Sequence, residues 1–149
     1  PVVVHGDGTS LWTLTHHTDF AAAFTGLLDN PLAVGDGFHI TSDEWLSWNQ
    51  IYELMAAAAG VREPALVHIP SARIAAAAPR VGPSLLGDKA HSLVFDNSKI
   101  KRLVPGWAAT VPFAVGAREI VAWHDADPAR RTVDEATDAL WDRLIGGTG

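Results

Sequence analysis

The sequence predicts a mixed α/β domain that is rich in helices and has a few short strands. Short β-branched or aromatic runs are bounded by Gly-Asp-Gly turns, as at 2–5 and 38–41. Longer segments repeat apolar residues at helical spacing, and most of them lie in the second half of the chain. The 149 residues, 48% hydrophobic and 19% charged, are enough for one domain with its own core.

Two strands and a helix are expected in the first 31 residues. The strands cover 2–5 and 11–16 and are separated by the turn Gly6-Asp7-Gly8. A helix should follow, with Thr18 or Asp19 as its N-cap, a stop at Asp29-Asn30-Pro31, and an apolar face made of Phe20, Phe24, Leu27 and Leu28.

In the middle of the chain, strands and helices are again expected to alternate. After a strand at 38–41, Ser47 and Gln50 have the spacing of a capping box and should open a helix that ends at Gly60. The apolar face of that helix comprises Trp48, Ile51, Tyr52 and Met55. A strand at 65–69, an Ala-rich helix at 71–78 and a Pro/Gly-rich loop at 79–87 are then expected in turn.

Helices dominate the remainder. Asp96 should cap a helix that runs through Leu103, and Thr132 with Glu135 suggests another capping box near the end. The face of the helix between them comprises Phe113, Ala117, Ile120, Val121 and His124. The face of the last helix comprises Val133, Thr137, Leu140, Trp141 and Leu144, before a frayed tail at 146–149.

Composition excludes several classes of function. The net charge of -6, without a basic block, argues against a nucleic-acid partner. Because the chain has no cysteine, it has neither a disulfide framework nor a thiolate metal site, and we expect a cytoplasmic location. No apolar run reaches about 18 residues, so we expect no membrane span.

The stretch His16-His17-Thr18-Asp19 allows three interpretations. Adjacent histidines on a strand point to opposite faces, so a metal would need one histidine, Asp19 and a distant third ligand. The interpretation we favour is a strand that runs into a helix, with Asp19 near the positive end of the helix dipole. In the third, one histidine lines a ligand cavity. We expect the pair Asp125 and Asp127 to form a solvated turn.

Four motifs in order resemble the C-terminal portion of the NAD-dependent epimerase/dehydratase family, the extended short-chain dehydrogenase/reductases. The family has a strand ending in Gly-Asp-Gly and then a helix-opening Asp, which Gly6-Asp7-Gly8 and Asp19 match. The segment FHITSDEWLSWNQIYELMAAAAG, from Phe38, is similar to a family strand and helix. The segments FDNSKIKRLVPGW and VPFAVGAREIVAWH resemble the family's tail through Asp96, Ser98, Lys99, Leu103, Gly106, Trp107, Pro112, Gly116, Val121 and Trp123.

The resemblance implies that residues 1–149 form the substrate-binding portion of a two-part enzyme. The family's N-terminal dinucleotide-binding half, with its Gly-rich loop and Tyr-x-x-x-Lys pair, is absent from this chain. The full-length protein is then expected to bind NAD or NADP and to transfer a hydride. The 149-residue chain alone should hold no catalytic residue, no cofactor and no metal, and should be inactive.

Two positions depart from the family's pattern. Trp12 stands where an Arg often holds a substrate phosphate, and Leu85-Leu86 stands where a second Arg is usual. This argues against a nucleotide-sugar and favours a sugar or another small molecule. The residues expected to bind the substrate are Trp12, Leu14, His16, Leu85, Leu86 and His91.

The alternative function is a non-catalytic binding or regulatory module that keeps the fold. The expected partners are the small-molecule substrate and the missing dinucleotide-binding half, and the resemblance also allows a homodimer. An RNA-binding relative is disfavoured by the acidic balance.

Overall fold

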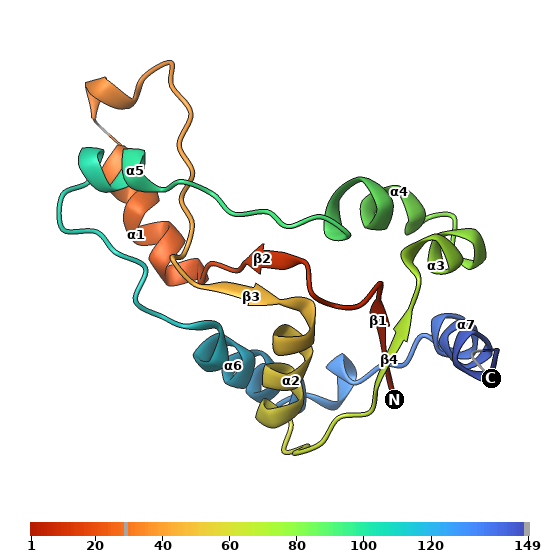
Figure 1. Cartoon of the computed structure of the whole chain (residues 1–149). Helices are drawn as coiled ribbons and strands as arrows, with labels where there is room; N and C mark the ends of the chain where they lie inside the picture. The colour runs from red at the N-terminus through yellow and green to blue at the C-terminus, as the bar shows by residue number, and fades with distance from the viewer. Residues whose placement is uncertain (29, 148–149) are drawn as a thin grey trace.

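Two small sheets lie at the centre of the computed structural model, which describes residues 1–28 and 30–147 (Figure 1). Strand β1 (Val2–His5) runs parallel to β4 (Leu66–Ile69), in a register that pairs Val2 with Leu66 and His5 with Ile69. Strand β2 (Leu11–Thr13) is antiparallel to β3 (Trp45–Ser47) and pairs Trp12 with Leu46. The strands are short and the helices more extensive, so the mixed, helix-rich fold class is confirmed.

Helices fill most of the rest of the chain. A five-residue π-helix, η2, covers Leu85–Lys89, and single 3-10 turns cover Pro31–Ala33 (η1) and Pro128–Arg130 (η3). The α-helices are α1 His17–Leu27, α2 Trp48–Ala58, α3 Ser71–Ala77, α4 Gly82–Ser84, α5 Ser98–Leu103, α6 Phe113–Asp125 and α7 Glu135–Gly146.

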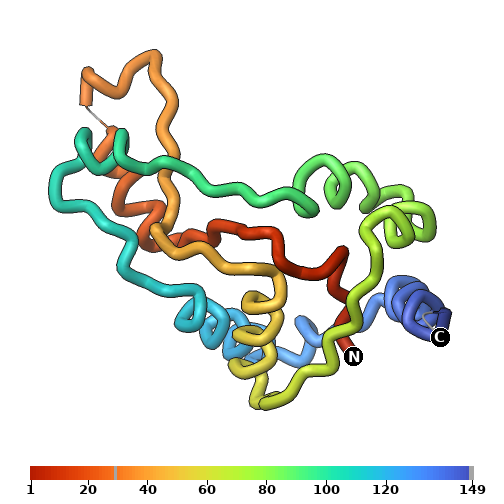
Figure 2. Tube along the Cα trace, viewed as in Figure 1, coloured from red at the N-terminus to blue at the C-terminus, as the bar shows by residue number. Residues whose placement is uncertain are grey.

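The hydrophobic core lies where β4, α3, η2 and α7 meet. Its buried members are Ile69, Ile74, Leu85 and Leu144, and Val3, Val67, Leu140 and Trp141 pack against them. The trace in Figure 2 shows how the C-terminal helix lies close to β4 and α3. The Arg73 guanidinium fixes that arrangement because it donates to the carbonyls of Leu144 (3.3 Å) and Gly147 (2.7 Å).

Several sequence predictions about elements are confirmed. The capping box of α2 is present, since the N–H of Gln50 donates to Ser47 Oγ and the N–H of Ser47 donates to Gln50 Oε1. Strand β4 and helix α3 lie where they were predicted. Of the pair predicted to form a turn, Asp127 does so, since its carboxylate accepts from the N–H of Ala129 at the start of η3, whereas Asp125 is the last residue of α6.

Other predictions about elements are wrong. The second strand ends at Thr13. Residues 38–41 form no strand, because the Thr41 carbonyl accepts from the buried amide of Asn97 (2.8 Å). The predicted loop at 79–87 contains α4 and most of η2. The predicted stop at Asp29 falls outside the described residues, as does the end of the predicted tail at 148–149.

The predicted caps also differ from those observed. His16 caps α1, because its Nδ1 accepts from the N–H of Thr18. Asn97 is the residue before α5, although Asp96 does accept from the N–H of Ser98. Asp134 caps α7, because its carboxylate accepts from the N–H groups of Ala136 and Thr137. At α1 and α7 a side chain two or three residues from a predicted one therefore accepts from the free N–H groups of the first turn, whereas at α5 the predicted Asp96 does so itself.

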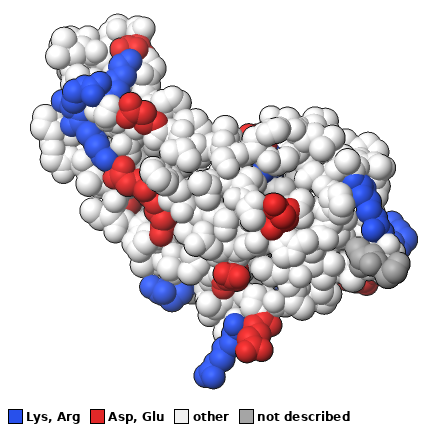
Figure 3. Space-filling view, viewed as in Figure 1, with Lys and Arg blue, Asp and Glu red and all other residues white. Residues whose placement is uncertain are grey.

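Acidic groups balance the basic cluster of α5. In Figure 3 the Lys and Arg at the upper left, where Figure 1 shows α5, lie beside carboxylates. Lys101 Nζ lies 2.7 Å from Asp43 Oδ1, and Lys99 pairs with Asp36. This face therefore lacks the continuous positive charge that would bind the phosphates of a nucleic acid. Within the described parts of the chain, no helix is long and apolar enough to cross a membrane.

Candidate functional site

The two segments predicted to bind the substrate lie side by side. Residues 89–93 run along the edge of β2 opposite β3: the N–H of Leu93 donates to the Leu11 carbonyl (2.9 Å), and the N–H of Leu11 donates to Ser92 Oγ (3.0 Å). Ser10 Oγ donates to the Lys89 carbonyl (2.8 Å). The loop that follows η2 is therefore held against the strand that carries Trp12.

An aromatic cluster lies behind this contact. The ring of Trp48 packs against Trp12 at 5.3 Å, against His5 at 5.0 Å and against Tyr52 at 6.1 Å between centroids. Burial raises the pKa of the Tyr52 hydroxyl, which stays protonated at neutral pH. The cluster makes a rigid apolar wall beneath the 89–93 segment.

Lys89 brings a positive charge to Trp12. Its Nζ lies 5.1 Å from the centre of a Trp12 ring, in the range of a cation–π contact. The same ammonium donates to Ser84 Oγ (2.7 Å) and lies 3.5 Å from an Asp88 carboxylate oxygen. Trp12, Leu85 and Leu86 carry no charge, but Lys89 supplies a cation beside them that was not expected from the sequence. It was missed because η2 winds the segment from Leu85 into a helix that places the Lys89 ammonium over the indole.

Two indole N–H groups in this cluster have no acceptor. Nε1 of Trp12 and Nε1 of Trp48 are both buried and make no hydrogen bond to the described residues. Buried donors are normally paired, so each is available to an acceptor atom of a ligand or of another segment.

His5 was not singled out from the sequence. It is buried, with 6% of its surface exposed, and its Nε2 lies 3.1 Å from the Lys89 carbonyl oxygen. Together with Ser10 it fixes the backbone that carries Lys89. A histidine at the end of a strand, just before a Gly-Asp-Gly turn, was the available signal.

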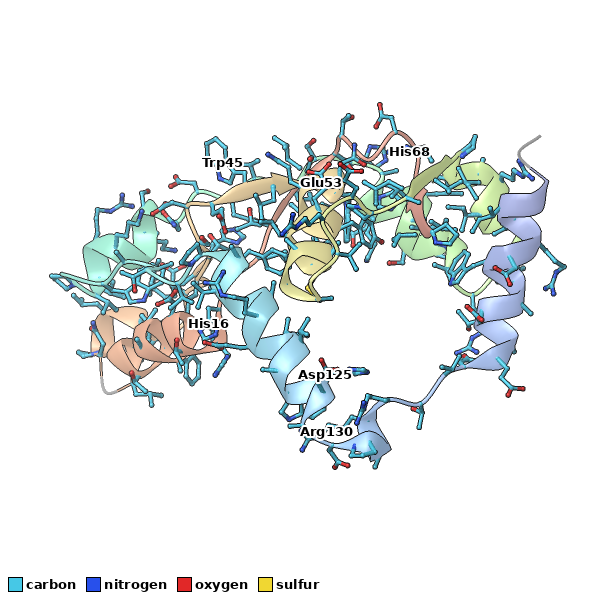
Figure 4. The ribbon with its side chains drawn as sticks, turned by 90° about the horizontal axis from the view of Figure 1, so that it is seen from below. His16, Trp45, Glu53, His68, Asp125 and Arg130 are labelled. Carbon is cyan, nitrogen blue, oxygen red and sulfur yellow. The ribbon has the colours of Figure 1, made fainter. Side chains whose placement is uncertain are left out.

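A cavity of about 660 Å³ lies between residues 14–17 and one side of α6, along nearly the whole length of that helix. Leu14 and His16 line it. His16 Nε2 lies 2.8 Å from Glu119 Oε2 on α6, and Figure 4 shows His16 between α1 and α6. We call this cavity the α6 groove. Its size is typical of a ligand site.

Solved structures share this arrangement of elements. No protein-family model matches the chain, and no curated protein matches it. A dTDP-glucose 4,6-dehydratase from Bacillus anthracis in complex with NAD matches 84% of the chain with a TM-score of 0.61 and 18% identity. A UDP-glucuronic acid 4-epimerase from Bacillus cereus in complex with NAD matches 87%, with a TM-score of 0.60 and 18% identity.

The chain has the fold of part of an NAD-dependent epimerase/dehydratase. The matched region is 34% of the dehydratase chain and 36% of the epimerase chain, so this chain spans about a third of their length. At 18% identity, the likeness establishes the fold alone. The predicted resemblance is confirmed at that level.

Within this epimerase/dehydratase fold, the six predicted site residues do not form one site. Trp12 lies in the aromatic cluster, and Leu14 and His16 lie at the α6 groove. Leu86 is 47% exposed, and its carbonyl lies 3.1 Å from Nε2 of the exposed His91. Leu85 is 6% exposed and belongs to the hydrophobic core, so we leave it out of the proposed binding surface.

The histidine pair is part of a helix start. The rings of His16 and His17 lie 4.2 Å apart, so the expectation that they point to opposite faces is wrong, because His17 is already helical. Asp19 is turned inward, where its Oδ2 accepts from the N–H groups of Thr110 and Val111. Among the described residues, no group of three His, Cys, Asp or Glu could hold a metal ion.

Proposed function

We propose that this chain is the substrate-binding part of an NAD(P)-dependent epimerase/dehydratase-like oxidoreductase, which acts in the cytoplasm on a sugar or another small molecule. The observation that carries the proposal is the match of most of the chain to about a third of two NAD-bound enzymes. In the longer protein, NAD or NADP would supply the hydride chemistry.

The residues of this chain do not suit the dinucleotide itself. A pyrophosphate site needs a glycine-rich turn with free N–H groups. In the turn after β1 the backbone groups of Gly8 already have partners within the chain: its carbonyl accepts from the N–H of Asn49, and its N–H donates to the His5 carbonyl. We therefore assign the cofactor to the preceding half of the longer protein and derive no chemical step from the present residues.

The substrate's class follows from the surroundings of Trp12. An indole offers one N–H donor and a face suited to stacking, and a lysine is a single point charge, unlike the two-pronged fork of an arginine. Lys89 already shares its charge with Asp88 and Ser84. A sugar with apolar ring faces and few charges fits this surface better than a diphosphate does.

Kinetics of the full-length protein test the proposal. It should bind NAD or NADP, and a panel of sugars and sugar acids should include one whose conversion changes the absorbance of the nicotinamide. Trp12→Ala should raise KM by about tenfold, the effect of losing one stacking contact of roughly 1.4 kcal/mol. The matched control is Trp45→Ala, because Trp45 lies on the paired strand and is 55% exposed.

The outcomes separate the proposal from its alternative. A folded full-length protein that binds neither cofactor would instead be the non-catalytic module. Turnover that Trp12→Ala and Trp45→Ala affect equally would remove Trp12 from the substrate site.

A further inference from the structure

Helix α6 carries an apolar stripe that faces the α6 groove. Phe113, Gly116, Ile120 and Trp123 follow one another at i, i+3, i+7 and i+10, which places them on one side of the helix, and all four line the groove. Ile120 is 51% exposed and Trp123 61%. The guanidinium of Arg130 covers one face of the Trp123 ring, at 4.0 Å from the ring centre. The stripe is therefore an apolar helix face that the described residues pack only in part.

Helix α1 continues this surface from the opposite wall. His17 lines the groove, and Phe20 and Phe24 follow it at i+3 and i+7 on the same side of α1. The two phenyl rings stack at 5.9 Å and are 46% and 48% exposed. Phe20 and Phe24 together with Ile120 and Trp123 are each about half exposed. These four side chains present on the order of 400 Å² of apolar surface, as much as a typical monomer shows in its largest patch.

The two walls are held in a fixed geometry. The 2.8 Å contact between His16 Nε2 and Glu119 Oε2 joins the start of α1 to α6. A Cβ at Gly116 would lie 3.4 Å from His16 Cδ2, which is van der Waals contact, so this turn of α6 lies directly against the His16 ring. The α6 groove is therefore already formed before anything binds there.

We propose that the α6 groove and the exposed rings of Phe20 and Phe24 are the surface on which the preceding half of the longer protein docks. This inference rests on the proposed function, and the match to about a third of longer chains supplies the occupant. The size of the surface agrees, since contacts between domains of one chain bury about 600–1,500 Å². A second copy of the chain would lose translational and rotational entropy on association, whereas a covalently linked half would not. A patch of this size is therefore large enough to hold a linked half in place.

Thiol labelling of the full-length protein tests the docking. This chain has no cysteine, so Trp123→Cys, Phe24→Cys and Val133→Cys each place a single thiol in it. Labelling of the parent protein is subtracted to account for thiols in the preceding half. Val133 is the control because, at 71% exposed, it matches the 61% of Trp123 but lies in the segment before α7. We expect the thiols at 123 and 24 to react about tenfold more slowly than the thiol at 133, because the label reaches them only when the docked half separates locally from this surface.

NAD binding, measured on the same preparations, separates this inference from the proposed function. Equal labelling rates at all three positions in a protein that binds NAD would overturn the docking and leave the function standing. Slow labelling in a protein that does not bind NAD would support the docking and overturn the function. If the thiols at 123 and 24 react slowly at high protein concentration but rapidly on dilution, the surface binds a second copy of the protein, and the inference is overturned.

Discussion

The carboxylate of Asp19 accepts a hydrogen bond from the backbone N–H of Val111, at 2.9 Å, across 92 positions of sequence. The same oxygen accepts from the N–H of Thr110 at 3.0 Å, and the Asp19 carbonyl accepts from Trp107 Nε1. Asp19 is 6% exposed, so these bonds replace its contact with water. This one side chain holds the segment before α6 against the start of α1 and so sets the position of the groove.

Asp19→Ala should lower the free energy of unfolding by about 2–3 kcal/mol, because the N–H groups of Thr110 and Val111 lose a buried, charged acceptor. Asp19→Asn keeps an oxygen in place and should lose about 1 kcal/mol, the difference between a charged and a neutral acceptor. Urea denaturation of the three proteins measures both values. Equal stability of Asp19→Ala and wild type would show that Thr110 and Val111 find other acceptors.

Gly8→Ala should destabilise the fold by about 2–4 kcal/mol. Gly8 has φ +70°, and a Cβ there would lie 2.8 Å from Val4 Cγ1 and would displace the side chain of Asn49. Asn49 would then lose its bonds to the Asp7 carbonyl and to His68. The matched control is Gly6→Ala, since Gly6 has φ +61° but its nearest neighbour would be Ser71 Oγ at 3.6 Å. The control should cost about 1 kcal/mol, and thermal unfolding that ranks the two variants the other way would contradict this account.

These two residues illustrate what the sequence could and could not predict. The positive φ of Gly8 follows from the Gly-Asp-Gly turn, because local signals determine local conformation. The placement of Asp19 near the start of α1 was also predicted, but its partners lie more than 90 positions away and leave no mark in local spacing. Lys89 was missed for a similar reason, since a π-helix has no reliable sequence signal and a loop was expected there.

The apolar faces were predicted as patterns but only partly as packing. Leu140, Trp141 and Leu144 do pack in the core, as the spacing in α7 predicts. Phe20, Phe24 and Ile120 have the same kind of spacing yet remain about half exposed. Periodicity shows that a helix needs an apolar partner, but it does not say whether the partner belongs to the same chain.

The stability of the protein should depend on the ionisation of Asp43. Hydrogen bonds from Lys101, and then from Asn97, lower the pKa of Asp43 below its ordinary value. A carboxylate with a lowered folded pKa stabilises the protein above its unfolded pKa of about 3.9, and the stabilisation is lost as the pH falls through the folded pKa. Asp43→Asn should therefore be less stable than wild type at neutral pH and approach it in acid. Thermal unfolding across pH measures this, with Glu53→Gln on the exposed side of α2 as the control; a gap that stays constant with pH would refute the role of ionisation.

The 149-residue chain should not bind NADH with micromolar affinity. Dinucleotide sites place the pyrophosphate at a glycine-rich turn that opens a helix, and the Gly8 turn is already hydrogen-bonded to Asn49 and His5. Titration of NADH fluorescence with the purified chain should show no saturation. The full-length protein serves as the positive control, and saturable binding by the 149-residue chain alone would place part of the cofactor site here.

The last prediction concerns nucleotide sugars. A diphosphate next to Trp12 would meet the single ammonium of Lys89, which is already shared with Asp88 and Ser84, and would lose much of its hydration. The full-length protein with its cofactor should therefore not turn over UDP-, GDP- or dTDP-sugars. The matched variants are Lys89→Ala and Lys101→Ala, because Lys101 is bound to Asp43 on α5 instead. Turnover of a nucleotide sugar that Lys89→Ala abolishes and Lys101→Ala preserves would show that Lys89 replaces the family's arginine and that the substrate class proposed here is wrong.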